Sequence, residues 1–77
     1  MQTTERHQIC AEAARDAAES LEAGARDTRS PAVKRIHYAA LARMERLAQA
    51  YHEEAAELTA QGLEVKDWID WLQARGI

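Results

Sequence analysis

The sequence predicts an all-α protein, a small antiparallel arrangement in which two long helices form a hairpin and a short helix follows at the C-terminal end. Apolar residues recur every three to four positions through most of the chain. The scattered glycines and the single proline fall between these periodic segments, and no segment has the pattern of a strand or a repeat. A chain of 77 residues has room for a single domain, residues 1–77.

The first helix is predicted over residues 4–23. Thr3 or Thr4 can cap its N-terminus with a side-chain oxygen, and Gly24 is the expected end. One side of this helix collects small and apolar residues, whereas charged residues occupy the opposite side. The apolar side consists of Ile9, Cys10, Ala13, Ala14, Ala17 and Leu21.

The second helix is predicted over residues 31–61. Ser30 provides a capping hydroxyl, Pro31 suits the first helical position, and Gly62 is the natural stop. Its apolar residues alternate in steps of three and four, and we expect this stripe to pack against the first helix. The stripe contains Val33, Ile36, Ala40, Met44, Leu47, Tyr51, Ala55 and Leu58.

The third helix is predicted over residues 65–75, where Val65, Trp68, Ile69 and Leu72 share one side and Gly76 follows. A helix rises about 1.5 Å per residue, so the first and third helices together match the length of the second. We therefore expect the first helix to run along the N-terminal two-thirds of the second, and the third to fold back over its C-terminal end.

Composition restricts the surroundings and the partners of the chain. Hydrophobic residues make up 47% of it, but alanine dominates them, aromatics are 5% and phenylalanine is absent, so self-association as a homodimer or docking on a partner is expected. Cys10 is the sole cysteine, which fits a cytoplasmic setting. Residues 1–12 lack the pattern of a signal peptide, and no apolar stretch is long enough for a membrane span.

Enzymatic chemistry has little support in the residues. Gly24, Gly62 and Gly76 are too scattered for a phosphate-binding loop, and neither Ser20 nor Ser30 lies in a nucleophile motif. The chain is therefore interpreted as a non-enzyme that binds no cofactor.

Histidines and the cysteine give the one spacing that resembles a metal site. His7 and Cys10 share a helical face, but His37 and His52 are about 22 Å apart along the second helix. We favour packing roles for these side chains and predict no metal.

Basic residues support an alternative function, a small nucleic-acid-binding regulator. Arg35, Arg43 and Arg46 are expected on the solvent side of the second helix, where they could bind phosphates, although an ordinary solvated helix face explains them more simply. Residues 55–72 also resemble a helix-turn-helix in outline. That segment holds Leu58 where a small residue is usual, and carboxylates open its last helix.

The C-terminal third gives the leading hypothesis, a non-enzymatic adaptor or inhibitor that binds a protein partner. Trp68 is expected to anchor the third helix, whereas Trp71 is either a partly exposed interface residue or a cover for the end of the core or a dimer seam. Acidic residues surround both tryptophans. The predicted partner-binding residues are Trp71, Trp68, Glu64, Asp67 and Asp70.

Overall fold

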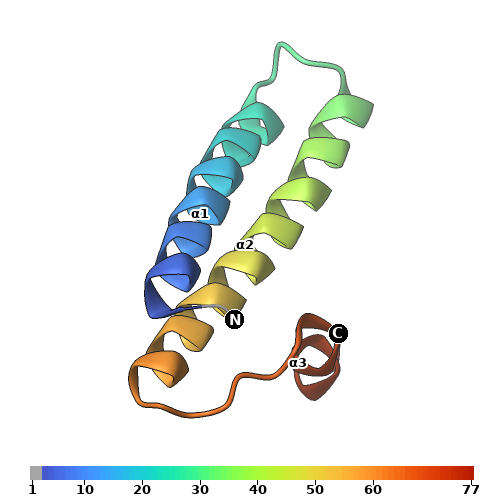
Figure 1. Ribbon diagram of the computed structural model, residues 1–77. Helices are drawn as coiled ribbons and strands as arrows, with labels where there is room; N and C mark the ends of the chain where they lie inside the picture. Colours follow the sequence, from blue (N-terminus) through green and yellow to red (C-terminus); the bar gives the residue numbers. More distant parts are fainter. Residues whose placement is uncertain (1–2) are drawn as a thin grey trace.

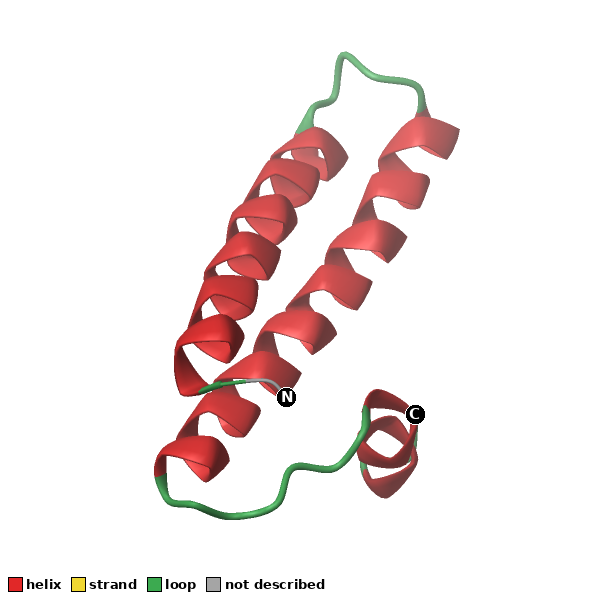
Figure 2. Cartoon of the chain, viewed as in Figure 1, coloured by secondary structure: helices red, strands yellow, loops and turns green. Residues whose placement is uncertain are grey.

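The computed structural model describes residues 3–77, and within that range it contains helices joined by loops (Figures 1 and 2). The helices are α1 (Thr4–Arg26), α2 (Ala32–Ala60) and α3 (Trp68–Ala74). Figure 1 shows α1 and α2 as an antiparallel hairpin, with α3 beside the C-terminal half of α2 on the side away from α1. The predicted hairpin with a short third helix is confirmed. None of the helices in residues 3–77 combines the length and apolar character needed to cross a bilayer.

The N-terminus of α1 is capped as expected, because the Thr3 hydroxyl accepts a hydrogen bond from the backbone N–H of Arg6 at 3.2 Å. Its C-terminus differs from the prediction, since the helix continues through Gly24 to Arg26. Gly24 has a negative φ and lies against the ring of Tyr38 on α2. This glycine therefore gives the two helices room to approach instead of ending the first one.

Only the C-terminal end of α2 agrees with the prediction. Pro31 occupies the N-cap position, so no side chain caps the helix and Ser30 does not play that role. At the other end Gly62 has a φ of 74°, and the N–H of Leu63 donates to the carbonyl of Leu58 at 2.9 Å. This pattern is a glycine-terminated Schellman turn, in which the left-handed residue closes the last helical turn.

Helix α3 begins later than predicted, at Trp68. Asp67 is its N-cap and accepts a hydrogen bond from the N–H of Asp70 at 2.8 Å, so residues 61–67 form a connecting loop. Gly76, with a φ of 77°, closes the helix as expected, and the N–H of Ile77 donates to the carbonyl of Leu72.

Contacts along the hairpin show how far α1 extends over α2. The Thr4 and Thr59 hydroxyls are 2.8 Å apart at one end, and Gly24 meets Tyr38 near the other. The expectation that α1 covers only the N-terminal two-thirds of α2 is therefore wrong. Helix α1 reaches the last turn of α2, and α3 finds room there only by packing on a different face.

Alanines form the seam between the two long helices. The buried residues of α1 are His7, Ala11, Ala14 and Ala18, spaced four and three apart, and α2 contributes Ala42 and Ala56. The apolar side predicted for α1 therefore does not coincide with the face that packs against α2, since Ile9 and Ala13 are exposed. Small side chains let two helices approach closely, which favours the alanine face over the face with the larger residues.

The apolar stripe predicted for α2 does not face α1 either. Residues of α2 that meet α1, such as Tyr38, Ala42 and Thr59, lie on one side of the helix. At 3.6 residues per turn, the positions of Val33 and Ile36 fall on roughly the opposite side. The C-terminal half of the stripe lies under α3, and the N-terminal half has no cover within residues 3–77.

Gly24 allows a test of the close approach between α1 and α2. A Cβ atom at this position would lie 2.8 Å from Cδ2 of Tyr38, so Gly24→Ala is expected to destabilise the protein despite alanine's better helix propensity. In a Tyr38→Ala background the same change should stabilise it, by up to about 1 kcal/mol. Urea unfolding of the four variants measures both effects. Stabilisation by Gly24→Ala in both backgrounds would contradict this packing.

Candidate interaction surface

An aromatic cluster of Tyr51, Trp68 and Trp71 attaches α3 to α2. The Trp71 ring lies 5.5 Å from the Tyr51 ring and stacks on Trp68 at 5.7 Å, measured between centroids. The Tyr51 hydroxyl donates to the carbonyl of Lys66 at 2.6 Å, and burial raises the pKa of this phenol. The cluster therefore holds both the helix and the loop that leads to it.

Trp71 is the more deeply buried tryptophan, with 5% of its surface exposed. Its indole N–H donates to the Glu54 carboxylate, and the Arg75 guanidinium lies 4.1 Å from the ring centroid. Of the two readings left open for Trp71, the structure supports the one in which it covers the core. Trp68, the expected anchor, is only half-buried. Trp68 still packs on Tyr51, with ring centroids 5.5 Å apart, so both tryptophans attach α3 to α2.

Acidic side chains around this cluster remain on the surface. Asp67 uses its carboxylate as the N-cap of α3, so it supports the local fold. Glu64 and Asp70 have no side-chain partner among the described residues. The C-terminal end of the molecule is consequently an acidic surface. Its exposed carboxylates are Glu53, Glu54, Glu57, Glu64, Asp67 and Asp70.

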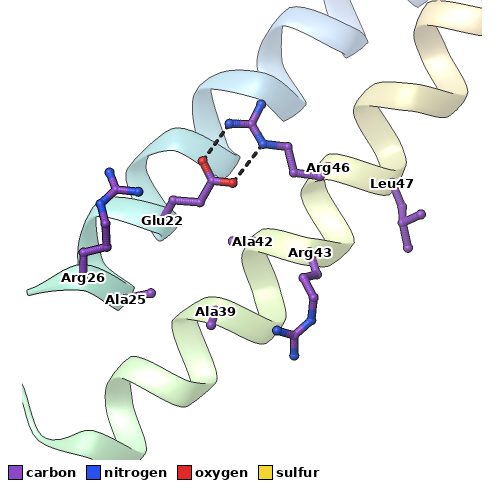
Figure 3. Close-up of a pocket in the computed structure, with 8 residues that line it drawn as sticks. All are labelled: Glu22, Ala25, Arg26, Ala39, Ala42, Arg43, Arg46 and Leu47. Atoms are coloured by element: carbon purple, nitrogen blue, oxygen red, sulfur yellow. Dashed lines mark hydrogen bonds and ion pairs between the residues drawn. The ribbon is translucent and has the colours of Figure 1, made fainter.

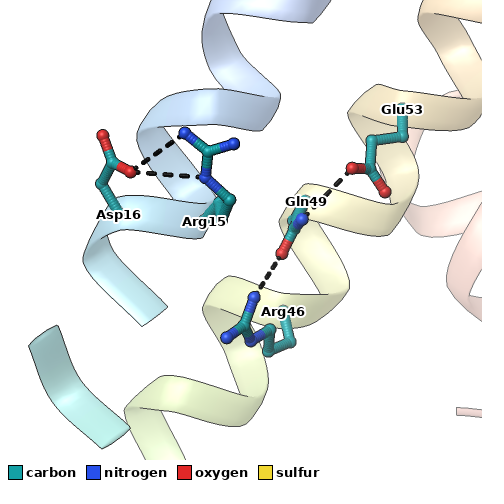
Figure 4. A network of polar contacts seen from close by, with 5 residues as sticks. All are labelled: Arg15, Asp16, Arg46, Gln49 and Glu53. Atoms are coloured by element: carbon teal, nitrogen blue, oxygen red, sulfur yellow. Dashed lines mark hydrogen bonds and ion pairs between the residues drawn. The ribbon is translucent and has the colours of Figure 1, made fainter. Parts of the chain in front are cut away.

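Arg46 is not free for an external ligand, because it bridges the two long helices. Its guanidinium meets the Glu22 carboxylate with two hydrogen bonds, at 2.7 and 3.0 Å. Figure 4 shows the same guanidinium donating to Gln49, which donates in turn to Glu53. The hydrogen bonds from Arg46 lower the pKa of Glu22. The predicted solvent-side strip therefore loses one of its three arginines to an ion pair.

The other two predicted arginines differ in exposure. Arg35 is half-buried, and its Nε is buried without a hydrogen-bond partner in the described structure, whereas Arg43 is exposed. Arg43 and Arg26 lie on the rim of an open trough of about 580 Å³ between α1 and α2 (Figure 3). Ala25, Ala39 and Ala42 line it between the helices. These basic side chains thus surround an apolar surface and do not form a continuous strip.

The outline of a helix-turn-helix is not reproduced. Such motifs join their helices by a turn of three or four residues, but here residues 61–67 separate α2 from α3. Helix α3 also turns its tryptophans toward α2 and presents Asp70 to solvent. This geometry does not support insertion of α3 into a DNA groove.

Histidines 7 and 52 meet in the seam, with their Nδ1 atoms 2.9 Å apart. His7 is 3% exposed, and His52 is half-buried beside it. Cys10 is half-buried and His37 is exposed. Within residues 3–77, no group of three or more histidine, cysteine, aspartate or glutamate side chains could hold a metal ion.

Large apolar side chains on the N-terminal half of α2 are left uncovered by the rest of residues 3–77. Val33, Ile36 and Met44 are 81%, 68% and 62% exposed, and Ala40 lies exposed between them. We call these four residues the uncovered strip. The stripe was visible in the sequence, but it was expected to be core. The alanines of α1, at positions 11, 14 and 18, are the sequence feature that could have indicated a different packing face, because small residues allow two helices to approach closely.

Comparisons with protein-family models, curated proteins and solved structures found no match to this chain.

Replacing Trp71 tests whether the aromatic cluster alone secures α3. Trp71→Ala is expected to cost about 3–5 kcal/mol, more than the remaining contacts of so short a helix can offset. Circular dichroism should then lose only the small contribution of α3, and limited proteolysis should cleave within residues 61–67. Ile69→Ala, on the exposed side of α3, is the matched control and should leave both measurements unchanged. Protection of the loop in Trp71→Ala would refute this role.

The histidine pair predicts a pH dependence of stability. Burial, with a smaller contribution from His7, lowers the pKa of His52 from its usual value of 6.5. The folded state therefore binds this proton less readily than the unfolded state, so stability is full above pH 6.5 and falls as the pH drops through that value.

Urea unfolding as a function of pH, repeated with His52→Gln, measures this contribution. The variant should lose less stability than the wild type between neutral and mildly acidic pH. His37→Gln changes an exposed histidine and is the control. Equal losses in all three proteins would mean that His52 does not resist protonation.

Proposed function

We propose that the chain is a non-enzymatic protein–protein interaction module, a small adaptor or inhibitor that docks through the uncovered strip of α2. The observation that carries this proposal is the exposure of Val33, Ile36 and Met44 on one helix face. Clustered large apolar side chains on a soluble surface are typical of docking sites. An amphipathic face of this kind binds another apolar helix or groove.

Protein is favoured over nucleic acid by the chemistry of the surface. Phosphate binding needs free basic groups, and Arg46 is already paired with Glu22. The trough rimmed by Arg26 and Arg43 also contains the apolar residues Ala25, Ala39, Ala42 and Leu47. Apolar contacts to an aliphatic partner would use this surface more fully than phosphates would.

The location of the docking surface differs from the one expected from sequence. Trp71 is buried in the aromatic cluster, and Asp67 caps the N-terminus of α3. Glu64 and Asp70 remain exposed, so the acidic end can contribute charge to an interface. The apolar part of the interface is assigned to α2.

Affinity capture with a paired variant tests this function. Tagged wild-type protein and Ile36→Asn/Met44→Gln serve as baits in lysate of the native host, with and without nuclease treatment, followed by quantitative mass spectrometry. Both positions are exposed, so the variant should fold normally. We expect wild type to retain protein partners that the variant loses about tenfold or more. Ile9→Asn makes the same kind of change at an exposed residue of α1 and is the control.

Two results would contradict the proposal. Identical protein recovery with the double variant would remove the strip from the interface. Loss of all recovery upon nuclease treatment would instead favour the nucleic-acid alternative and its arginines.

A further inference from the structure

We infer that the occupant of the uncovered strip is a second copy of this chain, arranged antiparallel to the first about a twofold axis near Ala40. This inference rests on the proposed function and names its partner. It joins three observations: the position of α3 on α2, the separation of charge along the molecule, and the exposed apolar residues of α3.

Helix α3 shows how this chain covers the same face of α2 within one molecule. The tryptophans of α3 pack on Tyr51 in the C-terminal half of α2. The uncovered strip lies in the N-terminal half of the same helix and begins at Val33. The strip and its continuation to Leu47 extend over about 21 Å. In a twofold antiparallel pair the two strips lie against each other, and each α3 lies just beyond the end of the other copy's strip. The α3 helices therefore set the register.

Charge along the molecule favours this antiparallel order. The loop end of the hairpin carries exposed Arg26 and Lys34, whereas Asp27 at that end is already paired with Arg29. The opposite end carries the acidic surface, including Glu64 and Asp70. Antiparallel pairing places the basic end of each copy beside the acidic end of the other. Parallel pairing would bring like charges together.

A stable dimer needs more contact area than the uncovered strip alone provides. A strip about 21 Å long and one helix wide, about 10 Å, is small against the roughly 800 Å² that each partner buries in a stable complex. Ile69 and Ile77, 58% and 62% exposed, extend the apolar surface at the α3 end. Their approach to the other copy's loop end would enlarge the interface at both ends of the axis. A twofold pair uses each of these surfaces twice.

Analytical ultracentrifugation of the purified full chain, over a range of protein concentrations and at low and high salt, tests the inference. Wild type should form dimers and no larger species, and Ile36→Asn/Met44→Gln should be monomeric. Two charge reversals, Arg26→Glu/Lys34→Glu at the loop end and Glu64→Lys/Asp70→Lys at the acidic end, should each raise the dimer dissociation constant about tenfold or more. Arg6→Glu/Arg15→Glu makes the same charge change on exposed residues of α1 and should have no effect.

Mixing the two charge-reversed proteins provides the decisive step. In a twofold antiparallel pair each altered end then lies beside an end of opposite charge, so the mixture should restore a heterodimer of wild-type affinity. No restoration, or a dimer unaffected by Ile36→Asn/Met44→Gln, would overturn the arrangement. Open-ended assembly that grows with concentration would also overturn it, because a twofold pair is closed.

Failure of this inference and failure of the proposed function give different results. A protein that stays monomeric at every concentration, yet captures another protein through Ile36 and Met44, would refute the dimer and keep the interaction module. A monomer whose captured proteins are indifferent to those two residues would refute both.

Discussion

The close approach of α1 and α2 is the constraint on which the rest of the molecule depends. Ala11, Ala14 and Ala18 meet Ala42 and Ala56 along the seam, and Ala18 is completely buried. Alanine gives little burial per residue, so stability accumulates through many small contacts over the length of the hairpin. A larger side chain on the seam would separate the helices and weaken the contacts next to it. Within residues 3–77, no large side chain is fully buried.

A seam of small residues leaves the larger apolar side chains to be covered elsewhere. On the C-terminal half of α2, α3 supplies that cover through Tyr51, Trp68 and Trp71. The loop of residues 61–67 is long enough to carry α3 around to the face opposite α1. The N-terminal half of α2 has no such cover in the described chain. Packing of α3 therefore meets the burial requirement on one half of α2 only, and leaves Val33, Ile36 and Met44 exposed on the other half.

The sequence predicted features with a local chemical cause and missed those decided by packing. Helix ends at Thr3, Gly62 and Gly76 follow from capping and left-handed turns, which a few neighbouring residues determine. Gly24 looked like the same signal, but the ring of Tyr38 explains it. The choice of seam was also missed, because hydrophobic periodicity favours the larger residues. The burial of Trp71 was also not determined by its neighbours in sequence, because it depends on contacts with Tyr51 and Glu54 of α2.

Because both tryptophans lie on α3, fluorescence and circular dichroism report on different parts of the molecule. Trp68 and Trp71 lie on α3, and the described residues of α1 and α2 contain no tryptophan, so intrinsic fluorescence reports the docking of α3. Ellipticity, in contrast, comes mostly from the two long helices. If α3 separates before the hairpin melts, the two spectroscopic transitions will not coincide, and an unfolding free energy from either probe alone describes only part of the chain.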